Sequence, residues 1–294
     1  MKTVTLIVLA GTTLCSALAG QQVSPEKLAQ CEARLRTQLD AARSGDQTFN
    51  LDLSGPSGGG ARLRYLGMRH TYDSTDTQLT EIQAVWEGLK PTVVFFEGTS
   101  NFVGPTLNAS VARSAEPGVL RYLAARDSIP ARSLEPPIAD EVQALLRSFT
   151  AEQLVLFYVT RPLTQIRDMN RVGGKLYGKP ALDSALVPLL ARVRTTAALA
   201  EAVPDTAAYR AAFARWFPSL DPSDTPSGWF NPERTSAETG SKFVNDVNRG
   251  SSAFRDLYMY RLLASAWGPG VRIFAAVGRA HVPAQAEALR CALQ

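Results

Sequence analysis

The chain has 294 residues, of which 45% are hydrophobic and 20% are charged, and it carries a formal net charge of +4. This length and apolar content suit one large core, or one core with an inserted subdomain. Because basic and acidic residues are intermixed along the chain, the charge pattern indicates no nucleic-acid partner.

The first 20 residues have the features of a signal peptide. A basic start is followed by an apolar stretch that ends with Ala17-Leu18-Ala19, the small-x-small pattern of a cleavage site. We predict cleavage near Ala19 and a secreted or periplasmic mature chain, with no integral membrane span after the signal is removed. One alternative is a membrane anchor, although three hydroxyl side chains interrupt the apolar stretch. Another is a lipoprotein anchored through Cys15.

Two cysteines belong to the mature chain, and they lie near its two ends. In an oxidising compartment we expect Cys31 and Cys291 to form a disulfide that ties the first mature helix to the last, worth about 2–4 kcal/mol. The alternative is two buried free thiols. Neither cysteine is near a histidine in the sequence, so cysteine catalysis is not expected.

The segment from 25 to 134 is predicted to alternate helices and strands. The clearest helix of this segment has four apolar residues on one face, because they are spaced three or four residues apart: Leu79, Ile82, Trp86 and Leu89. We expect Asp73 or Ser74 to cap it. The apolar run 93–96 is typical of a strand buried in a parallel sheet. The remaining expected elements are a helix over 25–42, a Gly/Ser-rich turn at 54–60, a strand over 62–66, a helix near 119–126 and a strand over 129–134.

From residue 138 to 266 the pattern is helical. Expected helices cover 138–149, the residues after a capping box of Thr150 and Gln153, 182–202, 207–216, 238–248 and 252–267. A last strand over 271–277 and a helix to Cys291 end the chain. The sequence thus predicts an α/β fold with a central mostly parallel or mixed sheet, joined by right-handed crossovers and flanked by helices. Residues 21–294 would form this single domain, with a large helical insertion, about 138–250, before the last strand.

Only two histidines occur in the chain, and each ends a G-x-x-H tetrapeptide. Gly67-Met68-Arg69-His70 follows an early predicted strand, and Gly278-Arg279-Ala280-His281 follows the last one. We expect each glycine to let the chain turn sharply off its strand, so that the imidazole bends back over the sheet edge. A single strand-end histidine is more often a hydrogen-bonding core residue, but the matched pair favours one shared site.

Two carboxylates also follow predicted strands. Glu97 comes directly after a buried apolar run, where a carboxylate is unfavourable unless it is paired or bound to a metal; a helix cap or a salt bridge is its alternative role. Glu135 precedes two prolines, and a surface turn is the competing interpretation there. Because ligands bind at the carboxyl ends of parallel strands, we expect His70, His281 and Glu97 to hold a divalent metal ion, with open positions for water and substrate. Such an ion promotes hydrolysis.

Arg255 lies in the long helix before the last strand. We expect its guanidinium to orient a substrate carboxylate or to stabilise a developing oxyanion, with a helix-surface ion pair as the alternative. The chain has no G-x-G-x-x-G after a strand, no phosphate loop, no H-E-x-x-H and no G-x-S-x-G. From their predicted places at strand ends and on the long helix, we expect Glu97, Arg255 and Glu135 to be the catalytic residues.

These motifs resemble those of the TraB/Tiki superfamily, which is related to the erythromycin esterases and to the ChaN-like haem-binding lipoproteins. The resemblance runs from about Arg62 to the C-terminus and depends on the order of short motifs: both G-x-x-H tetrapeptides, Glu97-Gly98, Arg255-Asp256 and the closing segment 277–282. It implies a mixed α/β fold with a helical insertion and a metalloprotease-like hydrolase that favours manganese or cobalt.

The resemblance also implies residue roles. His70 and His281 match the paired histidines, Glu97 the strand-end carboxylate and Arg255 the helical arginine, while Glu135 matches a less uniform acidic position. Esterase-like members often have Glu after the first glycine, where this chain has Met68, and that departure disfavours an antibiotic esterase.

The sequence therefore predicts an exported, metal-dependent hydrolase that acts on a peptide or ester bond in a peptide or small-molecule substrate. The competing class is a module that binds haem or a metal without turnover. A third possibility is a degenerate member that only packs or binds a partner.

Overall fold

A computed structural model describes residues 23–56, 59–172 and 179–294 of the chain. The predicted signal peptide, with Cys15, lies outside these residues. Within them, no helix is long and apolar enough to cross a membrane.

A five-stranded mixed sheet forms the centre of the described fold, which confirms the predicted α/β class. Its strands are β1 (Asn50–Ser54), β2 (Arg62–Met68), β3 (Val93–Phe96), β4 (Ala131–Ser133) and β5 (Arg272–Gly278), in the spatial order β1-β2-β5-β3-β4. β1 pairs antiparallel with β2, and the other pairs are parallel. β1 was not expected, because only Leu51 and Leu53 alternate with polar residues in it.

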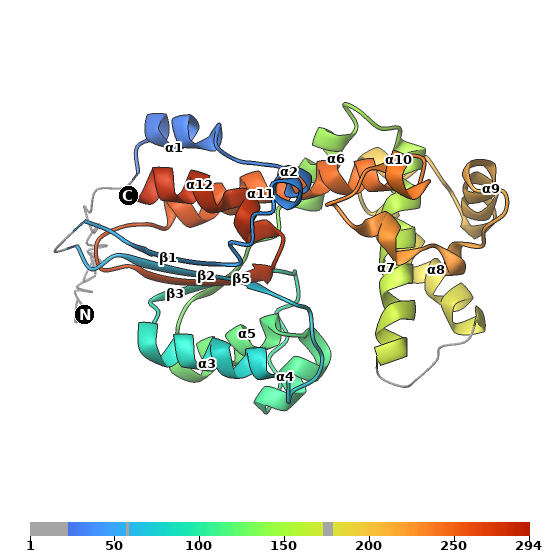
Figure 1. Ribbon diagram of the computed structural model, residues 1–294. Coiled ribbons are helices and arrows are strands. Elements are labelled where there is room, and N and C mark those ends of the chain that lie inside the picture. The colour runs from blue at the N-terminus through green and yellow to red at the C-terminus, as the bar shows by residue number, and fades with distance from the viewer. Residues whose placement is uncertain (1–22, 57–58, 173–178) are drawn as a thin grey trace, which may run out of the picture.

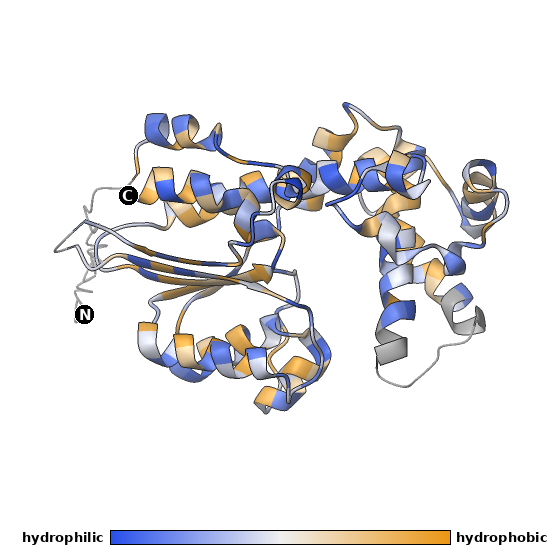
Figure 2. Ribbon diagram, in the orientation of Figure 1, coloured by the Kyte–Doolittle hydropathy of each residue, from blue (hydrophilic) through white to orange (hydrophobic). Residues whose placement is uncertain are grey.

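Helices cover both faces of the sheet (Figure 1). One face carries α3 (Thr77–Leu89), α4 (Leu107–Ser114) and α5 (Pro117–Asp127), and the other carries α1 (Pro25–Glu32), α11 (Val244–Ser265) and α12 (His281–Leu293). Apolar and polar residues alternate along these helices (Figure 2), as expected where one side of a helix packs in a core.

Most of the predicted elements are present, with local corrections. The apolar stripe of α3 is buried as predicted, but Asp76 caps this helix instead of Asp73 or Ser74. The single helix expected over 25–42 is two helices, α1 and α2 (Gln38–Arg43), because Thr37 caps a second start. The predicted disulfide between Cys31 and Cys291 is present and joins α1 to α12, with 5.5 Å between the Cα atoms.

The order of the strands creates a topological switch point at β5, where the connections change from one face of the sheet to the other. The chain passes from β2 through α3 to β3 and leaves a place between the two strands. β5 fills that place after arriving from α11 on the opposite face. Crevices at the carboxyl ends of strands next to such a switch point are the usual ligand sites of open α/β sheets.

The helical segment lies to one side of the sheet (Figure 1) and has its own apolar cluster, which includes Phe157 and Phe213. Its helices are α6 (Ile138–Leu145), α7 (Ala151–Val172), α8 (Lys179–Arg194), α9 (Thr206–Trp216) and α10 (Ser236–Thr239). The predicted capping box before α7 is present, since Thr150 and Gln153 exchange side-chain and backbone hydrogen bonds.

α11 joins the helical segment to the sheet. Val244 and Val247 at its start pack in the helical cluster, whereas Met259 and Leu263 pack against the sheet. Two separate helices had been expected over 238–248 and 252–267, and the expected end of the insertion near residue 250 lies inside this single helix.

Candidate functional site

The parallel register brings both G-x-x-H motifs to one edge of the sheet. Met68 pairs with Gly278, and Phe96 pairs with Ala276, so His70, Glu97 and His281 all follow the carboxyl ends of three adjacent strands. A Cβ atom built on Gly278 would lie 3.2 Å from Glu97 Oε2, 3.5 Å from His70 Nε2 and 3.7 Å from His281 Cδ2. The three side chains predicted to share a site therefore surround one glycine.

The two glycines of the motifs have roles other than the predicted one. Neither has a positive φ, and each is the last or second-to-last residue of a strand, so the expected sharp turn is wrong. Gly67 is needed because a Cβ there would lie 2.8 Å from both Arg279 Cα and the Phe49 carbonyl oxygen. Gly278 leaves open the space among the two imidazoles and Glu97, and its N–H donates to Glu97 Oε2 at 2.5 Å.

His281 and Asp256 form a buried pair, the inner histidine pair. His281 Nδ1 donates to Asp256 Oδ1 at 2.7 Å, and the two side chains are only 7% and 2% exposed. The amides of Gln38 and Gln285 also donate to Asp256, at 3.1 and 2.7 Å. These bonds fix the ring so that its other nitrogen, Nε2, lies 3.7 Å from Glu97 Oε1.

His70 and Glu116 form the outer histidine pair, which differs in exposure. His70 Nδ1 donates to Glu116 Oε1 at 2.7 Å; the imidazole is 59% exposed, whereas the carboxylate is 1% exposed. The hydrogen bond from His70 to Glu116, together with the negative charge of that carboxylate, raises the pKa of the imidazole to about 9. The Thr71 N–H donates to the second Glu116 oxygen at 3.3 Å.

A tight stretch of chain holds Glu116 in this position. Ala115 has φ 54° and ψ −155°, a conformation that is unfavourable for a residue with a side chain. A Cβ on Gly118 would lie 2.3 Å from the Ser110 carbonyl oxygen, so α5 approaches α4 closely enough to require glycine. Sequence reasoning missed Glu116 because it precedes a helix instead of following a strand.

Arg255 links the two strand-end carboxylates predicted as catalytic. Its Nη2 donates to Glu97 Oε1 and Glu135 Oε1, each at 2.6 Å, and its Nε donates to Glu135 Oε2 at 2.9 Å. Burial raises the pKa of Glu97, but the charges of Arg255 and the two imidazoles outweigh burial and hold this pKa well below its ordinary value. The structure thus brings together all five predicted site residues, and it adds Glu116 and Asp256.

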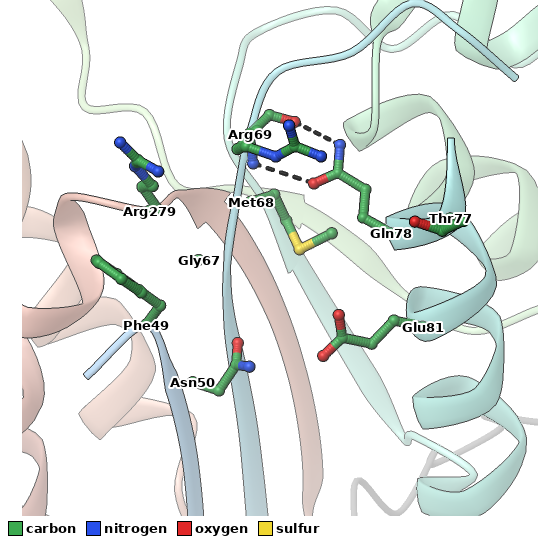
Figure 3. Close-up of a pocket in the computed structure, with 9 residues that line it drawn as sticks. All are labelled: Phe49, Asn50, Gly67, Met68, Arg69, Thr77, Gln78, Glu81 and Arg279. Carbon is green, nitrogen blue, oxygen red and sulfur yellow. Dashed lines mark hydrogen bonds between the residues drawn. The ribbon is translucent and has the colours of Figure 1, made fainter. Parts of the chain in front are cut away.

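A surface pocket of about 340 Å³ lies at the same edge of the sheet (Figure 3). It is lined by the middle residues of the two motifs, Arg69 and Arg279, and by residues of β1 and α3 that include Gln78 and Glu81. The Gln78 amide bonds to the backbone of Arg69 and closes one side. His70, Glu97 and His281 are not among the lining residues, so the pocket is a recess beside the histidine cluster.

The side chains around Gly278, which are His70, His281 and Glu97, are of the chemical types that bind divalent metal ions. Two imidazole nitrogens and a carboxylate are common ligands of such ions, and the 3.7 Å between His281 Nε2 and Glu97 Oε1 is shorter than two metal–ligand bonds of about 2.0–2.1 Å placed end to end. Across the described residues, however, no three His, Cys, Asp or Glu side chains are already grouped closely enough to hold a metal. His70 lies in a loop between β2 and α3, so it is the donor with most freedom to approach.

Comparisons of this chain with family models, with curated proteins and with solved structures found no match.

Proposed function

We propose that this protein is an exported, metal-dependent hydrolase of peptide or ester bonds, in which His70, His281 and Glu97 bind the metal. One observation carries the proposal: each imidazole is held through Nδ1 by a buried carboxylate, at 2.7 Å in both pairs, and Nε2 is left for the space at Gly278. Histidines that ligate metals are usually fixed in this way, because the outer carboxylate sets the tautomer and raises the basicity of the ring.

The residues around Glu97 prepare it to act as a ligand. A bound divalent ion would supply a water molecule of lowered pKa and would polarise the scissile carbonyl. Because the pKa of Glu97 is held well below its ordinary value, this carboxylate stays ionised, which suits a ligand better than a general base.

Arg255 and Glu135 are assigned to positioning. Arg255 shares its hydrogen bonds between Glu97 and Glu135, and the Gly98 N–H donates to Glu135 at 3.1 Å, so the carboxylates are kept apart and oriented. Substrate would enter on the side of His70, since that imidazole is exposed while His281 is buried.

Elemental analysis of the mature, untagged protein tests the metal site. We expect about one equivalent of a divalent metal in the wild type and much less in His281→Ala, His70→Ala and Glu97→Gln. Glu81→Gln, a carboxylate of the neighbouring pocket, is the matched control and should keep the metal. Equal metal content in all five proteins would refute the site.

Hydrolysis is tested separately with a p-nitrophenyl ester and a fluorogenic peptide. We expect activity that a chelator removes and that Mn, Co or Zn restores, with Glu97→Gln inactive. A metal that is bound through His70 and His281 without any turnover, or a bound haem chromophore, would instead support the binding-module alternative.

A further inference from the structure

The surface recess beside the histidine cluster is built on fixed backbone. The Gln78 side chain brackets Arg69, since it accepts from the Arg69 N–H at 3.1 Å and donates to the Arg69 carbonyl at 2.6 Å. On the other side, the Arg279 N–H donates to the Met68 carbonyl at 3.0 Å. Gly67 permits this approach, because a Cβ there would lie 2.8 Å from Arg279 Cα. The walls of the recess, of about 340 Å³, are therefore held in place by the protein itself.

Charges of opposite sign line the two ends of this recess. In Figure 3, Glu81 and Asn50 lie at one end, whereas Arg69 and Arg279 lie at the other. The Met68 thioether lies between the two ends. Among the described residues, no ion pair joins Glu81 to either arginine, so the two ends are farther apart than a direct contact. A ligand that spans the recess can meet both.

The charged groups at both ends have bonding capacity to spare. In the part of the chain that the structure describes, Glu81 makes no hydrogen bond or ion pair. The same holds for the Arg279 guanidinium, which lies over the Phe49 ring at 5.7 Å from its centroid. Arg69 has an ion pair with Asp76 at 3.7 Å, a distance too long for a hydrogen bond. One carboxylate and two guanidinium groups are thus available to a ligand.

We propose that this recess binds a small zwitterion, a molecule with an ammonium group at one end and a carboxylate at the other, such as a dipeptide. Glu81 and the Asn50 side-chain oxygen would accept from the ammonium group, and Arg69 and Arg279 would donate to the carboxylate. The volume is at the small end of the range for small-molecule sites, which suits one or two amino-acid residues. This site does not depend on the proposed hydrolase, because no step assigned to that reaction uses these side chains.

A molecule with a single charge fits the recess less well than a zwitterion. A simple anion would leave Glu81 without a partner and would be repelled by it, and a simple cation would be repelled by the two arginines. Each exposed ion pair contributes little by itself. A ligand that engages both ends loses its translational freedom once for two sets of contacts, and the fixed walls reduce the cost of ordering.

Binding of 5-aminopentanoate to the full mature chain tests the site without turnover. This zwitterion has the backbone length of glycylglycine but no peptide bond. NMR of isotope-labelled methionine methyl groups provides the readout, because Met68 lines the recess and Met259, buried in the core beside the sheet, serves as an internal reference. We expect the Met68 signal to shift with a Kd of about 1 mM or below while the Met259 signal stays in place.

Matched ligands and variants identify the two ends. Pentanoate and pentylamine each lack one charge, and each should bind roughly 10-fold or more weakly than 5-aminopentanoate. Arg279→Gln should weaken the binding of 5-aminopentanoate and pentanoate by roughly 10-fold. Glu81→Gln should also weaken 5-aminopentanoate but should strengthen pentanoate, since a repelling charge is removed. Arg34→Gln, which removes an exposed arginine just after α1, is the control and should bind as the wild type does.

Three results would overturn the proposal: a Met68 signal that does not respond to 5-aminopentanoate, equal affinity for the three ligands, or wild-type affinity in Glu81→Gln. The substituted side chains of Glu81, Arg279 and Arg34 are all exposed, so an otherwise unchanged spectrum separates loss of the site from loss of the fold. Because the measurement needs neither metal nor hydrolysis, a protein that binds 5-aminopentanoate but cleaves nothing would refute the hydrolase and keep the recess. A protein that binds metal and cleaves peptides but ignores 5-aminopentanoate would do the reverse.

Discussion

The inner and outer histidine pairs end the same tetrapeptide pattern but have opposite environments. His281 begins α12, is almost fully buried, and faces a carboxylate that two glutamine amides also hold. His70 lies in a loop and is 59% exposed, although its partner Glu116 is buried. The repeated motif therefore occurs in two different environments: one buried in the core between α11 and α12, and one exposed at the surface.

This difference has a physical origin in what packs behind each strand. β5 is the central strand and leads directly into a helix that covers the sheet, whereas β2 has only the antiparallel edge strand β1 on its other side and leads into a loop. The following experiments compare the inner and outer histidine pairs, beginning with the largest expected effect.

Removal of the carboxylate from each pair should affect stability very differently. Asp256→Asn replaces one of the two acceptor oxygens with an NH2 group, so that the buried His281 and two glutamine amides are left with a single uncharged acceptor, and we expect it to lower the free energy of unfolding by about 3–5 kcal/mol. Glu116→Gln should lower it by about 1 kcal/mol, because the exposed His70 can return to water. Urea denaturation of metal-free protein measures both values, and equal losses would contradict the distinction between the pairs.

The disulfide joins α1 to the helix that begins at His281 of the inner pair. α12 begins at His281 and carries Cys291, so the bond to Cys31 anchors the far end of the same helix. The double variant Cys31→Ser/Cys291→Ser should lose about 2–4 kcal/mol of unfolding free energy. We also expect the NMR signal of the His281 ring to broaden while that of His70 stays sharp. The reverse pattern would show that the helix does not transmit the constraint.

The two motif glycines provide a matched pair of substitutions. Gly67→Ala places a Cβ against backbone atoms that cannot move aside, so a loss of about 1–3 kcal/mol in unfolding free energy is expected. Gly278→Ala should change stability by less than about 1 kcal/mol, because its Cβ meets side-chain atoms at 3.2 Å or more. It should nevertheless reduce metal retention sharply, since the added methyl occupies the shared space. Unchanged metal content in a folded Gly278→Ala protein would contradict this role.

The smallest expected effect is the pH response of the outer pair. In metal-free protein, NMR titration should give His70 a pKa of about 9, and Glu116→Gln should return it towards the ordinary value of 6.5. Because the folded pKa is raised, the pairing stabilises the fold fully below pH 6.5, and this stabilisation is lost as the pH rises through about 9. Solvent screening should keep it under about 1 kcal/mol. A His70 titration that is indifferent to Glu116→Gln would refute the pairing.

The local sequence pattern was sufficient to predict elements that have a regular apolar spacing, a continuous apolar run or a capping motif. The α3 stripe, the apolar runs of β3 and β5 and the Thr150 capping box are each decided within a few residues, and they are present. Errors occurred where tertiary contacts decide the outcome, as in the edge strand β1 and the unbroken α11. β1 has too few apolar residues for a clear pattern, and it is stabilised by pairing with β2.

By itself, the sequence determined that two histidines and two acidic residues follow predicted strands. It also indicated that Cys31 and Cys291 could form a disulfide between the two ends of the mature chain. Only the tertiary structure decided that β5 lies between β2 and β3, which makes three strand ends neighbours. It also supplied the partners Glu116 and Asp256 and the need for glycine at positions 67 and 278. These features arise between segments far apart in the chain, where hydropathy periodicity carries no information about pairing.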